Sequence, residues 1–196
     1  MIIIMKKLII MILLGWFGCS FLLIGETKPA KNSVGFGSAF IPAMKNGIYF
    51  EDPWNFWPNR APSYMLQGSY ARLITPSLRV GFYMEYERIR FTVDSSLLIR
   101  SFRRYNAGID CIGQFPATPL HMQLGGYMGF GYLMANNWDN LAGIDFGLVA
   151  GPAWENEHIG VSAQVRSGFA PYSSSGTPKG VLLFNPKILL KIYYKF

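Results

Sequence analysis

The chain has 196 residues, which is enough for one domain, and its composition is unusual for a soluble globular protein. Aromatic residues make up 16% of the chain and charged residues only 15%, and there are 21 glycines. The formal net charge is +7, but the lysines and arginines are spread through alternating segments and form no basic run. This distribution argues against a nucleic-acid-binding protein.

The amino terminus has the pattern of a secretory signal peptide. Lys6 and Lys7 precede an apolar run over residues 8–18, which resumes over 21–25. We assign residues 1–25 to the signal, with cleavage between Ser20 and Ala30, and residues 32–196 to a single domain. Two other interpretations stay open, an uncleaved anchor and lipidation of Cys19. Once the signal is removed, Cys111 has no partner for an intramolecular disulfide.

The rest of the chain alternates between apolar and polar residues with a period of two, which predicts β-strands with two different faces. No further run of eighteen apolar residues occurs, so any membrane insertion must use strands. Segments of about ten residues suit a tilted strand that crosses a bilayer. The eight predicted strands are residues 33–44, 66–74, 77–87, 104–115, 120–132, 142–154, 159–169 and 184–196.

The connections between these segments alternate in length. After the second, fourth and sixth segments they are short: residues 75–76, 116–119 and 155–158. After the first, third, fifth and seventh they are residues 45–65, 88–103, 135–140 and 171–183. An even number of strands with short periplasmic turns and longer outer loops is typical of a bacterial outer-membrane barrel. The fold class predicted is therefore an all-β, eight-stranded antiparallel up-and-down transmembrane barrel.

The last thirteen residues show the pattern most clearly, with only Leu189 interrupting it. The signal sequence, the eight segments and the ending Ile192-x-Tyr194-x-Phe196 resemble the small outer-membrane barrels of the opacity-protein type. The stretch from Thr75 to Tyr86 is similar to the second hairpin of that group. The resemblance implies that Ile192, Tyr194 and Phe196 form the signal read by the barrel assembly machinery.

Charged residues of both signs fall on the polar faces, which would line the lumen. Unpaired buried charge is costly, so we expect these residues to form ion pairs. An eight-stranded barrel is just wide enough for side chains to fill, which favours a closed interior. The lumen ion pairs are predicted to involve Arg79, Glu85, Glu87, Arg104, Asp110, Asp145, Arg166, Lys187 and Lys191.

The sequence gives little sign of enzyme chemistry. Hydrolysis of lipid acyl chains would need a nucleophile beside a base at the outer leaflet. The two histidines, His121 and His158, both map to the periplasmic end of the predicted barrel. No metal-ligand cluster or phosphate loop is present, so no catalytic, metal or cofactor-binding residue is predicted. A lipid-modifying enzyme remains a distant alternative.

The first outer loop combines aromatic residues with prolines and charges, which is typical of recognition surfaces. Its aromatic residues are Tyr49, Phe50, Trp54, Phe56 and Trp57. The expected function is a structural or surface-interaction barrel of the outer membrane. The expected partners are outer-membrane lipids and lipopolysaccharide, the barrel assembly machinery, and an extracellular or envelope protein. The first outer loop could instead seal the mouth of the barrel. Alternative functions for the whole protein are a narrow channel or carrier and a soluble lipid-binding barrel.

Overall fold

The computed structural model describes residues 32–43, 48–51, 59–93, 98–115, 119–135, 140–173 and 180–196. The predicted signal peptide, residues 1–25, lies outside this part of the chain. The strands are β1 (Asn32–Ile41), β2 (Ile48–Glu51), β3 (Asn59–Arg60), β4 (Ser63–Thr75), β5 (Leu78–Val93), β6 (Leu98–Phe115), β7 (Leu120–Ala135), β8 (Leu141–Glu155), β9 (Ile159–Ser173), β10 (Gly180–Phe184) and β11 (Lys187–Lys195). Among the residues described, no helix has the length and apolar character needed to span a bilayer.

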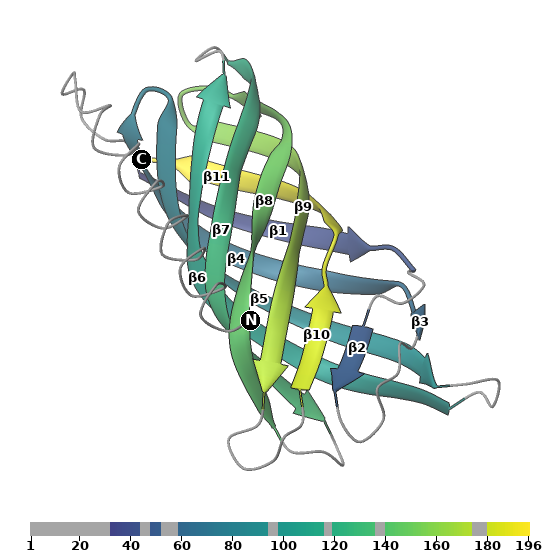
Figure 1. Cartoon of the computed structure of the whole chain (residues 1–196). Helices are drawn as coiled ribbons and strands as arrows, with labels where there is room; N and C mark the ends of the chain where they lie inside the picture. The colour runs from purple at the N-terminus through teal and green to yellow at the C-terminus, as the bar shows by residue number, and fades with distance from the viewer. Residues whose placement is uncertain are drawn as a thin grey trace.

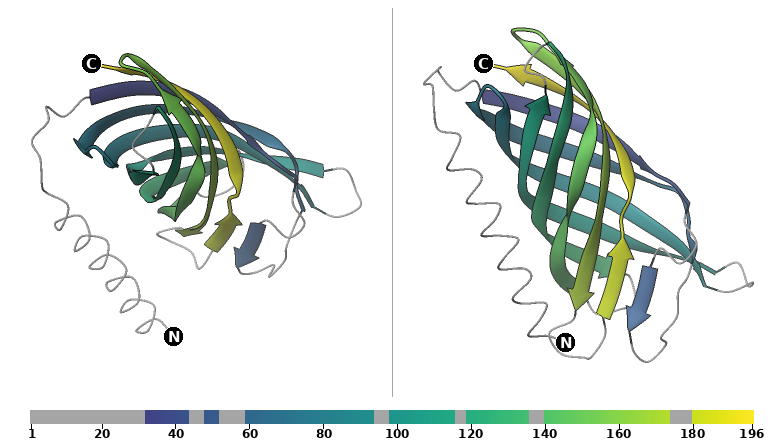
Figure 2. Two further views of the ribbon diagram at one scale, coloured as in Figure 1. Left: turned by 90° about the horizontal axis from the view of Figure 1, so that it is seen from above. Right: turned by 45° about the horizontal axis from the view of Figure 1, so that its top comes forward.

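The strands form one antiparallel sheet that closes on itself (Figure 1). The long strands β4 to β9 pair in chain order, and β1 pairs with both β4 and β11, which closes the barrel. β10 and β11 both pair with β9, so they are two halves of one interrupted strand. Figure 2 shows the strands tilted around a common axis. The predicted all-β barrel of eight strands is therefore confirmed.

Both ends of the described barrel wall meet at one rim. The amide of Asn32 donates to the carbonyl oxygen of Phe196 at 2.9 Å, and the amide of Phe196 donates to that of Asn32 at 2.9 Å. The turns at residues 76–77 and 156–158 lie at the same rim, as the antiparallel order requires. Short turns and chain ends are features of the periplasmic side of such barrels, so we refer to the opposite rim as the outer end.

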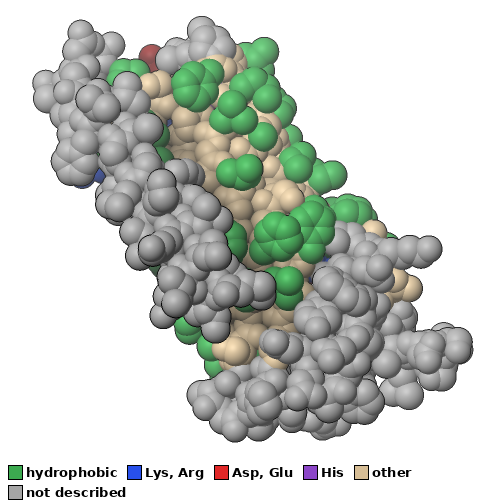
Figure 3. All heavy atoms as spheres, in the orientation of Figure 1, with side chains coloured by type: hydrophobic (Ala, Val, Ile, Leu, Met, Phe, Trp, Pro, Cys, Tyr) green, Lys and Arg blue, Asp and Glu red, His purple; other side chains and the backbone are tan. Residues whose placement is uncertain are grey.

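Alternation along each strand separates two faces. In β11, Lys187, Leu189, Lys191 and Tyr193 are buried in the lumen, while the residues between them are exposed on the wall. Large hydrophobic side chains point outward all around the barrel, with exposed fractions of 70% for Leu148 and 62% for Leu190. On the face seen in Figure 3, hydrophobic side chains cover much of the described wall. A soluble protein rarely exposes so extensive an apolar surface, whereas a barrel in lipid requires it.

Leu189, which interrupts the predicted alternation, also has an explanation. It points inward and is fully buried in a small apolar cluster with Ala39, Ile41 and Met65. These four side chains lie on β1, β4 and β11, which are neighbours in the sheet. An apolar residue on the lumen face is therefore stable where its lumen neighbours are also apolar.

Three of the four predicted outer loops are longer in the prediction than in the structure, whereas the loop predicted at residues 135–140 agrees with the ends of β7 and β8. Residues 88–103 were expected to form a long loop, but β5 continues to Val93 and β6 begins at Leu98. In the stretch 171–183, β9 continues to Ser173 and β10 begins at Gly180. The stretch 45–65 contains β2 and β3. The barrel thus extends further at the outer end than the outward hydrophobic pattern indicates. We call the parts of β5 to β10 beyond Tyr86 and Tyr105 the outer extension.

The last strand is also less regular than predicted. Residues 184–196 were expected to form one strand, but Asn185 and Pro186 separate β10 from β11. Proline has no amide hydrogen to donate and so interrupts the ladder. β10 pairs with β2 on its free side, while β11 pairs with β1. The interruption therefore marks where the eighth strand changes partner.

Candidate functional site in the barrel lumen

The candidate site is the barrel interior, where most of the charged side chains of the strands gather. All the predicted lumen residues point inward, and none is more than 8% exposed. Eight of the charged residues that the structure describes form one network near the middle of the lumen, and a smaller cluster lies at the periplasmic end. The network comprises Arg60, Glu85, Glu87, Arg104, Asp110, Asp145, Arg166 and Lys187.

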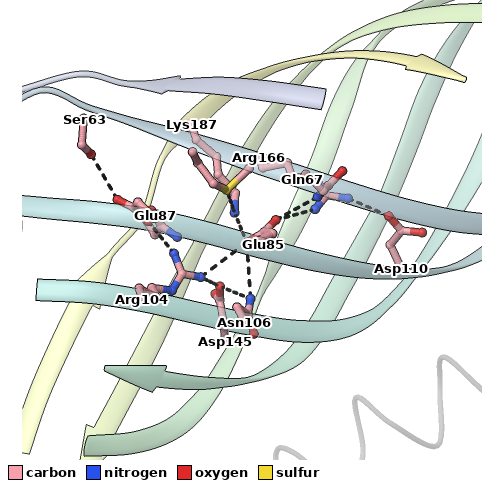
Figure 4. A network of polar contacts seen from close by, with 12 residues as sticks. Ser63, Gln67, Glu85, Glu87, Arg104, Asn106, Asp110, Asp145, Arg166 and Lys187 are labelled. Atoms are coloured by element: carbon pink, nitrogen blue, oxygen red, sulfur yellow. Dashed lines mark hydrogen bonds and ion pairs between the residues drawn. The ribbon is translucent and has the colours of Figure 1, made fainter. Parts of the chain in front are cut away.

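Glu85 is the centre of this network (Figure 4). Its carboxylate accepts hydrogen bonds from Lys187 Nζ at 2.8 Å, Gln67 Nε2 at 2.9 Å and Arg166 Nη1 at 3.2 Å. Arg166 also donates to Asp110 Oδ2 at 2.7 Å. These side chains come from β4, β5, β6, β9 and β11, so the contacts bridge the bore from several sides.

Arg104 links Glu85 to the two remaining carboxylates. It donates to Glu87 Oε2 at 2.8 Å and to Asp145, and its Nη2 lies 3.6 Å from Glu85 Oε2. Asn106 adds a hydrogen bond to Asp145 at 3.0 Å. A planar guanidinium suits this position because it presents several donors in fixed directions.

Arg60 is the network member that the sequence did not predict. It pairs with Glu87 and donates to the Phe184 carbonyl oxygen at 3.1 Å, and its side chain is fully buried. Arg60 lies in β3, which has only two residues and therefore no alternation to reveal which way its side chains point. With Arg60 included, four cations face four anions, so the network has no net formal charge.

A second cluster lies at the periplasmic end around Glu155. Its carboxylate pairs with Arg79, accepts a hydrogen bond from Tyr193 Oη at 2.6 Å, and pairs with Lys195 Nζ at 2.8 Å. His121 Nε2 lies 3.5 Å away from it. The sequence placed Glu155 in a turn, but it is the last residue of β8. Lys191 is buried between the two clusters and enters neither of them.

Inward tyrosines fill the space that inward glycines leave. A Cβ atom added at Gly160 would lie 2.2 Å from the ring of Tyr193, and one at Gly131 would lie 2.2 Å from Tyr172 Oη. Both distances are too short for a real contact, so only glycine is compatible with these ring positions. The glycines of the lumen face thus allow bulky side chains from across the bore to pack against the wall.

The inward face of the outer extension carries apolar side chains. A buried cluster of nine residues lies there: Ile89, Phe91, Phe102, Leu133, Leu141, Ala170, Tyr172, Val181 and Leu183. The rings of Phe91 and Phe102 stack with centroids 5.1 Å apart. Tyr172 connects this cluster to the polar network, since its hydroxyl accepts a hydrogen bond from Arg104 Nε at 2.9 Å.

The three predicted assembly-signal residues lie outside the lumen. Ile192, Tyr194 and Phe196 point outward at the periplasmic rim and are more than half exposed. Tyr49 and Phe50 lie in β2, although their side chains are outside the described residues, as are Trp54, Phe56 and Trp57 altogether. In the part of the chain that is described, no group of three His, Cys, Asp or Glu side chains has the arrangement of a metal site.

The closed barrel can be compared with solved structures. Neisserial surface protein A is similar over 86% of this chain and 100% of that chain, with 15% identity and a TM-score of 0.58. The outer membrane protein AlkL, determined in DMPC lipid bilayers, is similar over 88% of this chain and 97% of that chain, with 11% identity and a TM-score of 0.53. No protein-family model and no curated protein sequence matches the chain. The likeness shows that the chain has the fold of small outer-membrane barrels.

Proposed function

We propose that the chain is an integral protein of the bacterial outer membrane whose lumen is sealed and whose role lies in contacts at the outer surface. The exposed hydrophobic wall supports the membrane setting, because side chains such as Leu148 and Phe130 would otherwise face water. The fold shared with Neisserial surface protein A supports the same setting. The proposal assigns no catalytic step to the chain.

The observation that carries the sealed lumen is the network around Glu85 and Arg104. Its members come from β3, β5, β6, β8, β9 and β11 and are almost fully buried. Above the network, the apolar cluster around Phe91 and Phe102 fills the outer extension. An ion crossing the barrel would have to displace both layers, which makes steady conduction unfavourable.

The test is conductance across a planar bilayer, with heat-modifiable migration on a gel used to verify that the refolded protein is a closed barrel. We expect no discrete current steps. The Lys191→Gln variant removes a lumen charge that lies outside both ion-pair clusters. Current steps whose ion selectivity shifts in this variant would contradict the sealed lumen and support the narrow channel instead.

The surface role rests on the sequence of the first outer loop. We infer that Trp54, Phe56 and Trp57 form a partner-binding surface, since exposed aromatic residues give large contact area at low entropic cost. Replacing all three with Ala should abolish photo-crosslinks, formed on intact cells, between this protein and an extracellular or envelope partner. Heat-modifiable migration on a gel should be unchanged, because the barrel itself still folds. A matched change in the last outer loop, Ser174→Ala, should have no effect. If the triple variant instead loses its migration shift, the loop seals and stabilises the mouth.

A further inference from the structure

Three arginines project outward from the wall of the outer extension. Arg88 and Arg90 lie on the exposed face of β5, and Arg103 lies on the exposed face of β6. Arg88 and Arg103 are directly opposite each other in the antiparallel register, and Arg90 lies one step further along the same face. We call these three residues the arginine patch.

The patch lies directly beyond a row of tyrosines. Tyr86 is opposite Tyr105, with ring centroids 5.3 Å apart, and Tyr105 is opposite Tyr132 on β7. Exposed tyrosines on a membrane barrel mark the level of the lipid headgroups. A shift of two residues along a strand is about 7 Å, so Arg88 and Arg103 lie at or just above that level.

Nothing in the described part of the chain neutralises the patch. None of its ion pairs and side-chain hydrogen bonds includes the guanidinium group of Arg88, Arg90 or Arg103. Like charges placed directly opposite each other on a sheet are destabilising. The Arg88–Arg103 pair therefore does not help the barrel to fold, and an anion bound between the two guanidinium groups would remove the repulsion.

We propose that the arginine patch binds the phosphate groups of a phosphorylated glycolipid in the outer leaflet. Guanidinium groups bind phosphate through paired hydrogen bonds, and two of them side by side provide two such forks. The wall beneath the patch continues into exposed hydrophobic side chains, among them Met84 at 61% and Phe130 at 61%. A lipid with phosphates above its acyl chains matches this order of charge, tyrosine and hydrocarbon-facing residues. The inference rests on the proposed membrane setting but not on the sealed lumen.

The experiment is native mass spectrometry of the full chain in detergent micelles, titrated with bisphosphorylated lipid A. Substitution of Arg88, Arg90 and Arg103 by Gln in one variant should weaken binding at least about tenfold, because the charge-assisted hydrogen bonds are lost. The matched control is Arg72→Gln, which removes an outward arginine from β4 at the opposite rim. We expect this control to bind as the unaltered chain does.

Three results would overturn the proposal. The triple variant could bind the lipid as tightly as the unaltered chain, or Arg72→Gln could weaken binding equally, which would indicate a general charge effect. Displacement of the lipid by millimolar inorganic phosphate alone would indicate a site for soluble phosphate.

A further control removes the phosphates from the lipid. If the patch binds phosphate, dephosphorylated lipid A should bind the unaltered chain no better than the phosphorylated lipid binds the triple variant. Because the patch lies outside the lumen, bilayer conductance stays an independent test of the sealed barrel.

Discussion

The two parts of strand β5 follow opposite rules. Up to Glu87 its outward residues are apolar, such as Met84 and Tyr86, and its inward residue Glu85 is charged. Beyond Glu87 the outward residue Arg90 is charged, and the inward residue Phe91 is apolar. The strand keeps its alternation throughout, so the side-chain directions are unchanged and only the polarity of each face is exchanged.

Strand β6 shows the same exchange at the same level. Tyr105 faces outward and Arg104 inward, whereas one step further Arg103 faces outward and Phe102 inward. Each residue is matched to its surroundings, since hydrocarbon lies outside one zone and water outside the other. The exchange therefore locates the outer boundary of the membrane between Tyr86 and Arg88. In β5 and β6, the outer extension therefore has apolar residues inside and charged residues outside, as expected for a barrel wall in contact with water.

A substitution at Glu85 tests the charged interior of the membrane zone and should destabilise the barrel most. Glu85→Gln removes the carboxylate that Lys187, Arg166 and Arg104 share, and leaves buried cations without full compensation. We expect the free energy of unfolding to fall by about 3–5 kcal/mol. Urea unfolding in lipid vesicles, followed by tryptophan fluorescence, measures this change.

The control for that change is Glu157→Gln, which neutralises an exposed glutamate in the turn after β8. We expect it to alter the free energy of unfolding by less than about 0.5 kcal/mol. If Glu85→Gln were equally silent, the lumen would have to be hydrated enough to solvate the orphaned cations. The charged lumen of the membrane zone would then not depend on ion pairing for its stability, and it would not differ in this respect from the apolar interior of the outer extension.

The next effect tests the outward face of each zone. Leu148→Arg places a charge at the middle of β8, where the side chain faces hydrocarbon, and should cost about 2–4 kcal/mol of unfolding free energy. Met134→Gln also places a polar group on the outward face, but opposite Arg103 in the outer extension, and should cost less than about 0.5 kcal/mol. Equal costs in vesicle unfolding would mean that the membrane boundary is not between Tyr86 and Arg88.

The difference between the zones also explains what the sequence could predict. The outward hydrophobic residues predict all eight barrel strands and their faces, because hydrocarbon imposes one pattern on every strand. The outward hydrophobic pattern ends at Tyr86, so the sequence alone predicts a loop after this residue. Its apolar residues Ile89 and Phe91 fall on the other face, so the strand continues with its polarity exchanged.

The lumen partners show where sequence reasoning stops. Charges on the inward face were predicted because the direction of a side chain follows from strand period. Which cation meets which carboxylate depends on the tilt and register of strands that are far apart in the chain, such as β5 and β11. Arg60 could not be placed because β3 is too short to show a pattern. Glu155 could not be placed because a strand end and a turn look alike in sequence.

A last pair of variants makes the same small substitution in both zones. Ile89→Val removes a methylene group from the buried cluster of the outer extension, where a cavity would remain, and should cost about 0.5–1.5 kcal/mol. Ile109→Val removes the same group from the outward face of β6, where Ile109 is 52% exposed and lipid would fill the space. We expect that variant to change the unfolding free energy by less than about 0.5 kcal/mol. The reverse order of costs in vesicle unfolding would mean that packing against lipid in the membrane zone contributes more to stability than packing inside the outer extension.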